Sequence, residues 1–329
     1  MKIGTVTRRS AQILLCASLI WLGALQAQGY QLHSGFASAA TAEDHALPPA
    51  SEKLRQFAAD AIQELAKNEP FTGWTQANPI IEPLGPGTHS WLVTLKSETS
   101  GNPGPLGYLI ISATPEGSYK LVEYGLGENS LYAQPALESG LAELGLSSLS
   151  QSRPGITPVY AGPVLAEWMI RTTSKPGAVH FLDAVTGEVL PENADSWNRQ
   201  ATKYRPPASA VESGQHALNP EETVRLADLF DPYDNILWMT GDAVRTATDR
   251  INPILKALET SRRLVFVANG PERTYSIPLP VYGYQTWKSD PESSGGNTAV
   301  YVLTGTDSAE RWISLDALLD SGKFVAYKD

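Results

Sequence analysis

The sequence of 329 residues contains a single cysteine, Cys16, which lies in an apolar run near the amino end. The rest of the chain therefore has no disulfide and no thiol nucleophile. It also lacks the Gly-x-Ser-x-Gly and Ser-x-x-Lys motifs and a phosphate-binding glycine-rich loop. Each of the five histidines is isolated, so no pair has metal-ligand spacing. These absences predict a protein that binds rather than catalyses, with no cofactor and no metal site.

The amino end has the three parts of a secretory signal. The basic pair Arg8-Arg9 precedes the apolar run 13–25, and small residues follow. The run is shorter than the ~20 residues that cross a bilayer. We expect residues 1–27 to be a signal peptide, with an uncleaved N-terminal anchor as the alternative, and residues 28–50 to be a linker. This predicts a protein of the extracellular space or the cell envelope.

Acidic residues exceed basic ones, with 35 Asp and Glu against 25 Lys and Arg and a formal net charge of −10. Such a surface repels nucleic acid and anionic lipid. Hydrophobic residues make up 42% of the chain, enough to build a sizeable core. We therefore expect a protein partner, with a carbohydrate or peptide ligand as the alternative. We expect no nucleic acid, and membrane contact only through residues 1–27 if they are retained.

Residues 51–191 show a helical pattern followed by strand patterns, and this order occurs twice. Apolar residues at spacings of three and four predict a helix over 51–67, and alternating segments predict three strands over 89–124. A second helix is predicted at 134–146, and further strands over 156–190. Each helix needs an apolar surface to cover, so the sequence predicts two tandem helix-on-antiparallel-sheet units.

The hairpin 181–190 resembles the last hairpin of the PepSY family: a strand ending in Phe-Leu-Asp-Ala, a Thr-Gly turn and a return strand. Segments 107–114 and 119–125 are similar to strands in propeptide and inhibitor modules of secreted peptidases. The resemblance covers about residues 51–191 and implies an inhibitor, a folding aid or an envelope regulator. An unrelated α+β module is the alternative. In this hairpin we expect Asp183 to accept hydrogen bonds from the turn, and Gly187 to supply its backbone freedom.

Residues 192–218 are polar and include Pro206-Pro207, which predicts a second linker. Beyond it, short helices are predicted at 221–230 and at 240–258, the latter kinked at Pro253. Many short strands follow, so residues 219–329 are expected to form a small β-rich, barrel-like domain with helices. The predicted fold class is α+β: tandem helix-on-antiparallel-sheet units followed by this domain.

The candidate ligand-binding residues are Tyr282, Tyr284 and Trp287. Strand alternation would place Tyr282 and Tyr284 on one face. Exposed rings would stack on a sugar or a proline-rich peptide, whereas internal rings would be core. The cluster 231–235, with two aspartates and an asparagine, predicts a capped turn rather than a cation site.

Three functions follow in order of preference. The first is an exported, non-enzymatic binding protein that inhibits, assists or regulates a secreted or envelope protein by edge-strand or surface recognition. The second is a secreted carboxylate-dependent hydrolase, because folding can bring distant carboxylates together. The third is a cell-wall or carbohydrate-binding protein that acts through the aromatic residues.

Overall fold

The computed structural model describes residues 50–85, 87, 89–97, 105–127, 130–147, 155–172, 178–214, 218–246, 249–268, 275–289, 298–307 and 309–328. The expectations for the signal peptide 1–27 and for the linker, apart from Ala50, fall outside these residues. Residues Pro49–Asp329 form one compact unit. Among the described residues, no helix is long and apolar enough to cross a membrane.

Within the described ranges, nine strands form a curled antiparallel sheet in the order β1-β2-β3-β4-β15-β14-β13-β10, and β9 also pairs with β13. The strands are β1 (Ala77–Leu84), β2 (Ser90–Ser97), β3 (Pro105–Ala113), β4 (Tyr119–Leu126), β9 (Leu218–Pro220), β10 (Val224–Arg225), β13 (Gly283–Ser289), β14 (Thr298–Thr306) and β15 (Ala309–Ser314). The first half of the chain therefore supplies one side of the sheet and the last third supplies the other. Strands β4 and β15 join them, with Trp312 opposite Tyr124.

Two smaller sheets complete the β structure of the described residues. One has the order β5-β6-β7-β8, and the other the order β12-β11-β16. Their strands are β5 (Ile156–Tyr160), β6 (Ala166–Arg171), β7 (Val179–Asp183), β8 (Val189–Leu190), β11 (Leu264–Ala268), β12 (Ile277–Val281) and β16 (Gly322–Ala326). The helices and 3-10 turns are α1 (Glu52–Leu65), η1 (Thr72–Gln76), α2 (Gln134–Glu143), α3 (Ala194–Ala201), η3 (Ile236–Thr240), α4 (Asn252–Ser261) and α5 (Leu315–Leu319).

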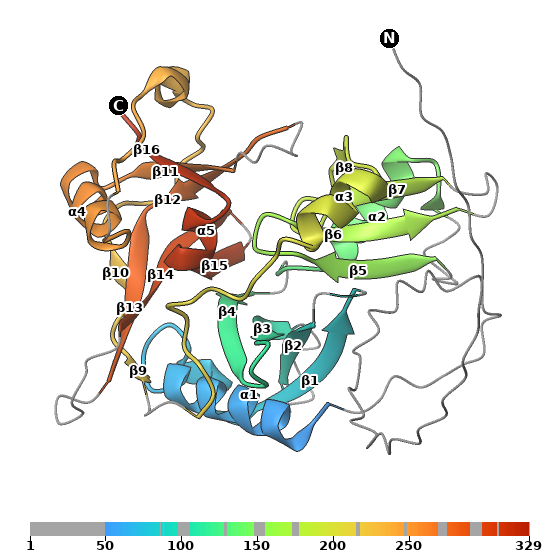
Figure 1. Cartoon of the computed structure of the whole chain (residues 1–329), viewed down its shortest axis with the longest axis horizontal. Coiled ribbons are helices and arrows are strands. Elements are labelled where there is room, and N and C mark those ends of the chain that lie inside the picture. The colour runs from blue at the N-terminus through green and yellow to red at the C-terminus, as the bar shows by residue number, and fades with distance from the viewer. Residues whose placement is uncertain are drawn as a thin grey trace, which may run out of the picture. The chain divides into compact units, whose positions relative to one another are not determined.

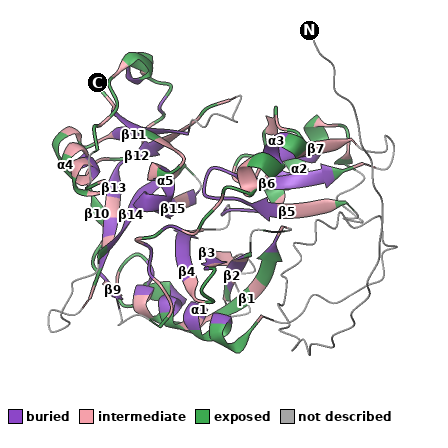
Figure 2. Ribbon diagram, viewed as in Figure 1, coloured by how far each residue is buried: buried purple, intermediate pink, exposed green. Residues whose placement is uncertain are grey.

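The large sheet has an apolar core on each face, and the two faces differ. On the face that α1 covers, one continuous cluster extends from Leu54 on α1 through Leu109 on β3 to Leu303 on β14. On the opposite face the core is divided. One cluster lies under the sheet β5–β8 and α2, and another lies under β11, β12, β16 and α4. Figure 1 shows α1 on one side of the large sheet and the two smaller sheets on the other. Figure 2 shows the joining strands β4 and β15, and β14 beside them, as mostly buried.

These observations correct the predicted fold class. The structure is mostly β, and tandem helix-on-sheet units followed by a separate barrel-like domain do not occur in it. The reason is that β4 does not end the first sheet but pairs with β15, from the other end of the sequence. The strands β5–β8 form a separate sheet that packs over the first, so the repeated order along the chain does not produce a repeated unit.

Several local predictions agree with the structure, and others do not. The helix over 51–67 is α1, where Ser51 accepts a hydrogen bond from the Leu54 N–H as the N-cap. The predicted helix over 221–230 is wrong, because this stretch contains β10 and irregular chain. Pro253 does not kink a helix but lies in the first turn of α4, where a missing N–H costs nothing. Within the predicted linker 192–218, Asn193 and Ser196 form a capping box that begins α3.

Candidate functional site

A buried ion pair lies at the junction of the two halves of the large sheet. Glu123 on β4 is fully buried, and Arg311 on β15 is 5% exposed. The Arg311 Nη2 donates to both Glu123 carboxylate oxygens, at 3.1 and 3.0 Å, and to the Pro163 carbonyl at 3.2 Å. The Tyr108 hydroxyl donates to Glu123 Oε1 at 2.8 Å. This network lies in the gap between the two apolar clusters of the divided face.

Burial and charge act together on the ionisable groups of this network. Burial, followed by the nearby Glu123 carboxylate, raises the pKa of Tyr108 and that of Tyr160 well above 10.0. Burial is the largest single influence on Arg311 and lowers its pKa, but the Glu123 carboxylate and the Tyr108 hydroxyl together outweigh burial and raise the pKa of the guanidinium. The tyrosines are therefore neutral and the arginine is charged at any ordinary pH. Gly125 makes the arrangement possible, because a Cβ there would lie 2.5 Å from the Tyr108 ring.

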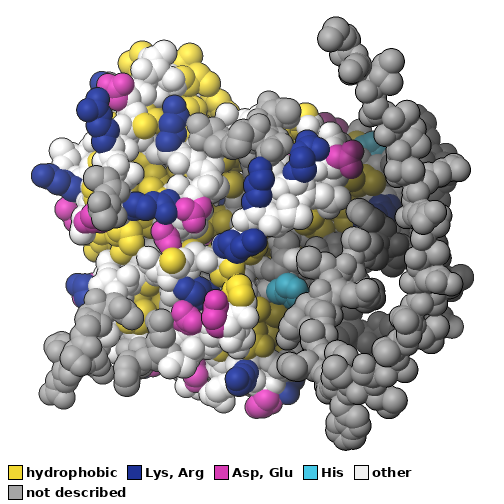
Figure 3. Space-filling view, viewed as in Figure 1, with side chains coloured by type: hydrophobic (Ala, Val, Ile, Leu, Met, Phe, Trp, Pro, Cys, Tyr) yellow, Lys and Arg dark blue, Asp and Glu magenta, His cyan; other side chains and the backbone are white. Residues whose placement is uncertain are grey.

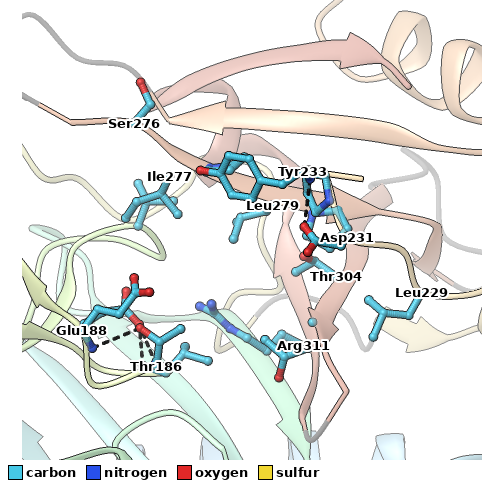
Figure 4. Close-up of a pocket in the computed structure, with 18 of the residues that line it drawn as sticks. Thr186, Glu188, Leu229, Asp231, Tyr233, Ser276, Ile277, Leu279, Thr304 and Arg311 are labelled. Atoms are coloured by element: carbon cyan, nitrogen blue, oxygen red, sulfur yellow. Dashed lines mark hydrogen bonds between the residues drawn. The ribbon is translucent and has the colours of Figure 1, made fainter. Parts of the chain in front are cut away.

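Above this network the structure contains a cavity of about 700 Å³, which we call the cleft. Its walls come from five places: Pro163 and Val164 between β5 and β6, the turn between β7 and β8, the segment 229–234, the strand β12 with the two residues before it, and the end of β14 with the turn that follows. Arg311 lines it as well. In Figure 4 the Arg311 side chain points into the space between Glu188 and Thr186 on one side and Asp231 and Thr304 on the other. The cleft thus exists only where the two halves of the chain meet.

Five carboxylates line the cleft: Asp183, Glu188, Asp231, Asp234 and Asp307. Two of them have structural duties. Asp183 Oδ1 accepts hydrogen bonds from the N–H groups of Val185 and Thr186 and from the Thr186 hydroxyl, which confirms the predicted role of Asp183. Asp231 Oδ1 accepts from the Tyr233 N–H at 2.8 Å, so the predicted capped turn forms. Glu188 and Asp307 are exposed.

The walls of the cleft also hold hydrogen-bonding atoms without partners. Thr304 is 1% exposed, and its Oγ1 has no hydrogen-bond partner. The bonds that Arg311 makes use Nε and Nη2, so among the described residues none accepts from its Nη1. A buried polar atom that lacks a partner costs free energy. A ligand that supplied an acceptor here would recover that free energy.

Next to the cleft, four large apolar side chains lie on the surface of one short segment. Tyr233, Ile236, Leu237 and Met239 are between 56% and 60% exposed, and we call them the exposed apolar cluster. Figure 3 shows apolar side chains gathered at the upper end of the view, where this segment lies. The segment is anchored from beneath, because Trp238 is buried and its Nε1 donates to the Pro232 carbonyl at 2.6 Å. Tyr233 belongs both to this cluster and to the lining of the cleft.

The predicted ligand-binding aromatics lie elsewhere. Tyr282 and Trp287 are almost fully buried in the core beneath α1, which favours the core alternative for both. Tyr284 packs against the cluster on the opposite face, and its hydroxyl donates to Glu259 Oε1 at 2.8 Å. Tyr282 and Tyr284 therefore do not share a face, because the chain leaves β12 at Val281 and enters β13 at Gly283, which breaks the alternation.

The sequence pointed to only part of this site. It singled out Asp183 and the cluster 231–235, but neither Arg311 nor Thr304 carries a local signal. Among the described residues, no group of three or more His, Cys, Asp or Glu side chains is placed to hold a metal ion.

Comparisons with family models, with curated proteins and with solved structures gave no match. The resemblance to PepSY modules therefore stays a prediction.

Proposed function

We propose that this chain is an exported, non-enzymatic binding protein whose cleft receives a segment of a partner protein. Its role would be that of an inhibitor, a folding aid or a regulator of a secreted or envelope protein. The observation that carries this proposal is the cleft itself, about 700 Å³ in volume and lined by a buried hydroxyl without a partner. Cavities of roughly 300–1,000 Å³ are typical of ligand sites.

Recognition through the cleft is favoured over strand addition at a sheet edge. Three of the strands that end a sheet contain proline: β1 at Pro79 and Pro83, β5 at Pro158, and β12 at Pro278 and Pro280. Proline has no N–H to donate, so an added strand would find an incomplete ladder at these edges. The other end strands, β8, β10 and β16, lack proline, but β8 and β10 are only two residues long. A partner that binds between the walls of the cleft needs no such ladder.

The second candidate, a carboxylate-dependent hydrolase, is favoured by one observation: five carboxylates line the cleft. Such an enzyme needs one carboxyl group as a proton donor and another as a nucleophile or base. Asp183 and Asp231 are instead engaged with backbone N–H groups of their own turns. The binding function therefore takes first place, and cleavage of a bound peptide is the outcome that would favour the hydrolase.

The proposal is tested by selecting a random peptide library against the protein and measuring the affinity of the enriched peptides. Ile277 lies on the wall of the cleft, and Ile277→Trp fills part of it. The matched control is Gln63→Trp, at an exposed position on α1, on the other face of the large sheet. A melting curve for each variant verifies that it is folded.

We expect enriched peptides to bind the wild type and the Gln63→Trp variant equally and to lose at least tenfold in affinity for the folded Ile277→Trp variant. Enriched peptides that bind all three proteins equally would contradict the proposal. So would a library from which no peptide is enriched. Peptides recovered in cleaved form would replace the binding function with hydrolysis.

A further inference from the structure

We infer that the cleft takes an extended, cationic segment of a protein. Its lysine or arginine side chains lie against the carboxylates of the cleft, and a neighbouring apolar side chain lies on the exposed apolar cluster. This inference rests on the proposed function, since it names the occupant of the same cleft.

The charge of the cleft selects against an anion. Among the described residues, five carboxylates line it, and the one cation among them, Arg311, is already paired with Glu123. A phosphate or an acidic peptide would therefore meet like charges on three sides of the cleft. A ligand with positive groups would instead be attracted by these carboxylates.

These carboxylates are not arranged to bind a metal ion, because within the described residues no three acidic or histidine side chains lie close enough together to be its ligands. The carboxylates come from three separate elements: the β7–β8 turn with Glu188, the segment with Asp231 and Asp234, and the β14–β15 turn with Asp307. Acids spread in this way suit several cationic groups held some distance apart. Successive basic side chains of an extended chain have that arrangement.

A buried donor in the wall favours an occupant that also brings an acceptor. The Thr304 hydroxyl is buried without a partner and can donate. A polyamine carries positive charge but no acceptor, whereas a peptide has a carbonyl oxygen at every residue. The cleft therefore combines a buried donor, the Thr304 hydroxyl, with several carboxylates. This combination fits a basic peptide better than it fits a small amine.

The exposed apolar cluster extends the site beyond the cleft. Its segment is held by buried Trp238 and by Asn235, whose side chain donates to the Lys328 carbonyl at 2.8 Å. The exposure of Leu237 and Met239 is thus a fixed property of the fold and not a fraying end. Apolar side chains gathered on one surface mark contact sites. A partner segment that leaves the cleft past Tyr233 would meet them at once.

The test uses fluorescently labelled octapeptides in the full chain's binding assay: one alternates lysine and leucine, one serine and leucine, one glutamate and leucine, and one lysine and serine. Unlabelled spermidine serves as competitor. Glu188→Gln with Asp307→Asn removes two charges from the cleft. The matched control, Glu82→Gln with Glu116→Gln, removes two exposed charges from β1 and from the β3–β4 turn. Thr304→Val and Leu237→Ser probe the hydroxyl and the apolar cluster.

We expect the lysine-leucine peptide to bind most tightly, the serine-leucine peptide weakly and the glutamate-leucine peptide not at all. The cleft double variant should weaken the lysine-leucine peptide roughly three- to tenfold, the scale of two partly exposed ion pairs. The control double variant should change the affinity for the lysine-leucine peptide by less than about twofold. Thr304→Val should weaken binding about fivefold, the scale of one hydrogen bond, without lowering the melting temperature. Leu237→Ser should weaken the lysine-leucine peptide but not the lysine-serine peptide.

Two failures are distinguishable. If the serine-leucine or glutamate-leucine peptide binds as tightly as the lysine-leucine peptide and Ile277→Trp abolishes that binding, the cleft is a peptide site but the inference about charge is wrong. If no peptide binds in a way that Ile277→Trp blocks, the proposed function fails as well. Displacement of the lysine-leucine peptide by an equal concentration of spermidine would assign the cleft to a small amine and overturn the inference.

Discussion

The two faces of the large sheet are built differently. The face beneath α1 carries one apolar cluster that continues from β2 and β3, across the β4–β15 junction, to β13 and β14. The opposite face carries two clusters under two separate sheets, with Glu123, Arg311 and the cleft between them. The continuous face joins the two halves of the chain into one structure. The divided face leaves room for polar groups and a ligand.

The comparison explains why the site is where it is. The continuous cluster is closed by α1, which contributes six buried residues, together with Phe71, Trp74, Val211 and Leu218. Two small sheets over the same strands leave a space where their borders approach each other. A polar network is stable in such a space only if its members pair with one another, as Glu123 and Arg311 do. The site is therefore a consequence of how the second face is covered.

The largest effect is expected from Glu123→Ala. This change leaves the Arg311 guanidinium buried and without its carboxylate, which should lower the free energy of unfolding by about 3–5 kcal/mol. The double variant Glu123→Leu with Arg311→Met removes both charges and should come close to the wild-type stability. Urea unfolding of both variants measures this. A cost below about 1 kcal/mol for Glu123→Ala would mean that the pair is not enclosed as described.

A pair of core substitutions separates the two faces. Leu303→Ala lies in the continuous cluster and Ile313→Ala in one of the divided ones, and both residues are fully buried. Each should cost roughly 2–5 kcal/mol. Amide hydrogen exchange should show that Leu303→Ala loosens β2 and β3 as well as β14. Ile313→Ala should act mainly on β11, β12 and β16. The same exchange pattern in both variants would argue against a difference between the faces.

The turn that borders the cleft provides a glycine test. Gly187 has a φ of +77°, and a Cβ there would collide with the Ala136 carbonyl oxygen on α2. Gly117 has a similar φ of +84° but open space around it. We expect Gly117→Val to cost about 1–2 kcal/mol from the backbone alone, and Gly187→Val to cost roughly 3 kcal/mol. Thermal melts compare the two, and equal costs would show that the β7–β8 turn does not pack against α2.

The smallest effect on the free energy of unfolding is expected at alkaline pH, from the ionisation of individual buried tyrosines. Burial raises the pKa of Tyr108, Tyr124, Tyr132 and Tyr160 above 10.0. Above pH ~10 the unfolded chain loses these protons while the folded chain keeps them, so the contribution of these tyrosines to stability is constant below that pH and falls above it. Each tyrosine contributes at most about 1.4 kcal/mol per pH unit. Tyr108→Phe should make the fall less steep, and urea unfolding between pH 9 and pH 11 measures it.

Local signals in the sequence were sufficient for individual elements. The apolar spacing of Leu54, Phe57 and Ile62 identified α1, and the Asp-x-x-x-Gly step of the hairpin identified the Asp183 turn. Elements whose residues also favour loops were not predicted from the sequence. Strand β1 contains Pro79 and Pro83, and α3 begins at a capping box inside a polar segment.

The site could not be predicted for a different reason. Glu123 and Arg311 are 188 residues apart, and the pairing of β4 with β15 that brings them together leaves no mark on either strand alone. Nor does a sequence show which polar side chain will be buried without a partner, as Thr304 is. These features depend on long-range pairing, and so does the curled sheet that replaced the predicted tandem units.

The central claim is that both halves of the chain build one sheet and that the cleft exists only in their union. The direct test inserts a protease site between Gly214 and Leu218, cleaves the folded protein and measures the fragments by gel filtration and near-ultraviolet circular dichroism. The account predicts that the fragments stay together with the native spectrum, and that each fragment, separated in urea and returned to buffer alone, lacks it. Two fragments that separate freely and each keep a native spectrum and a cooperative melt would contradict it.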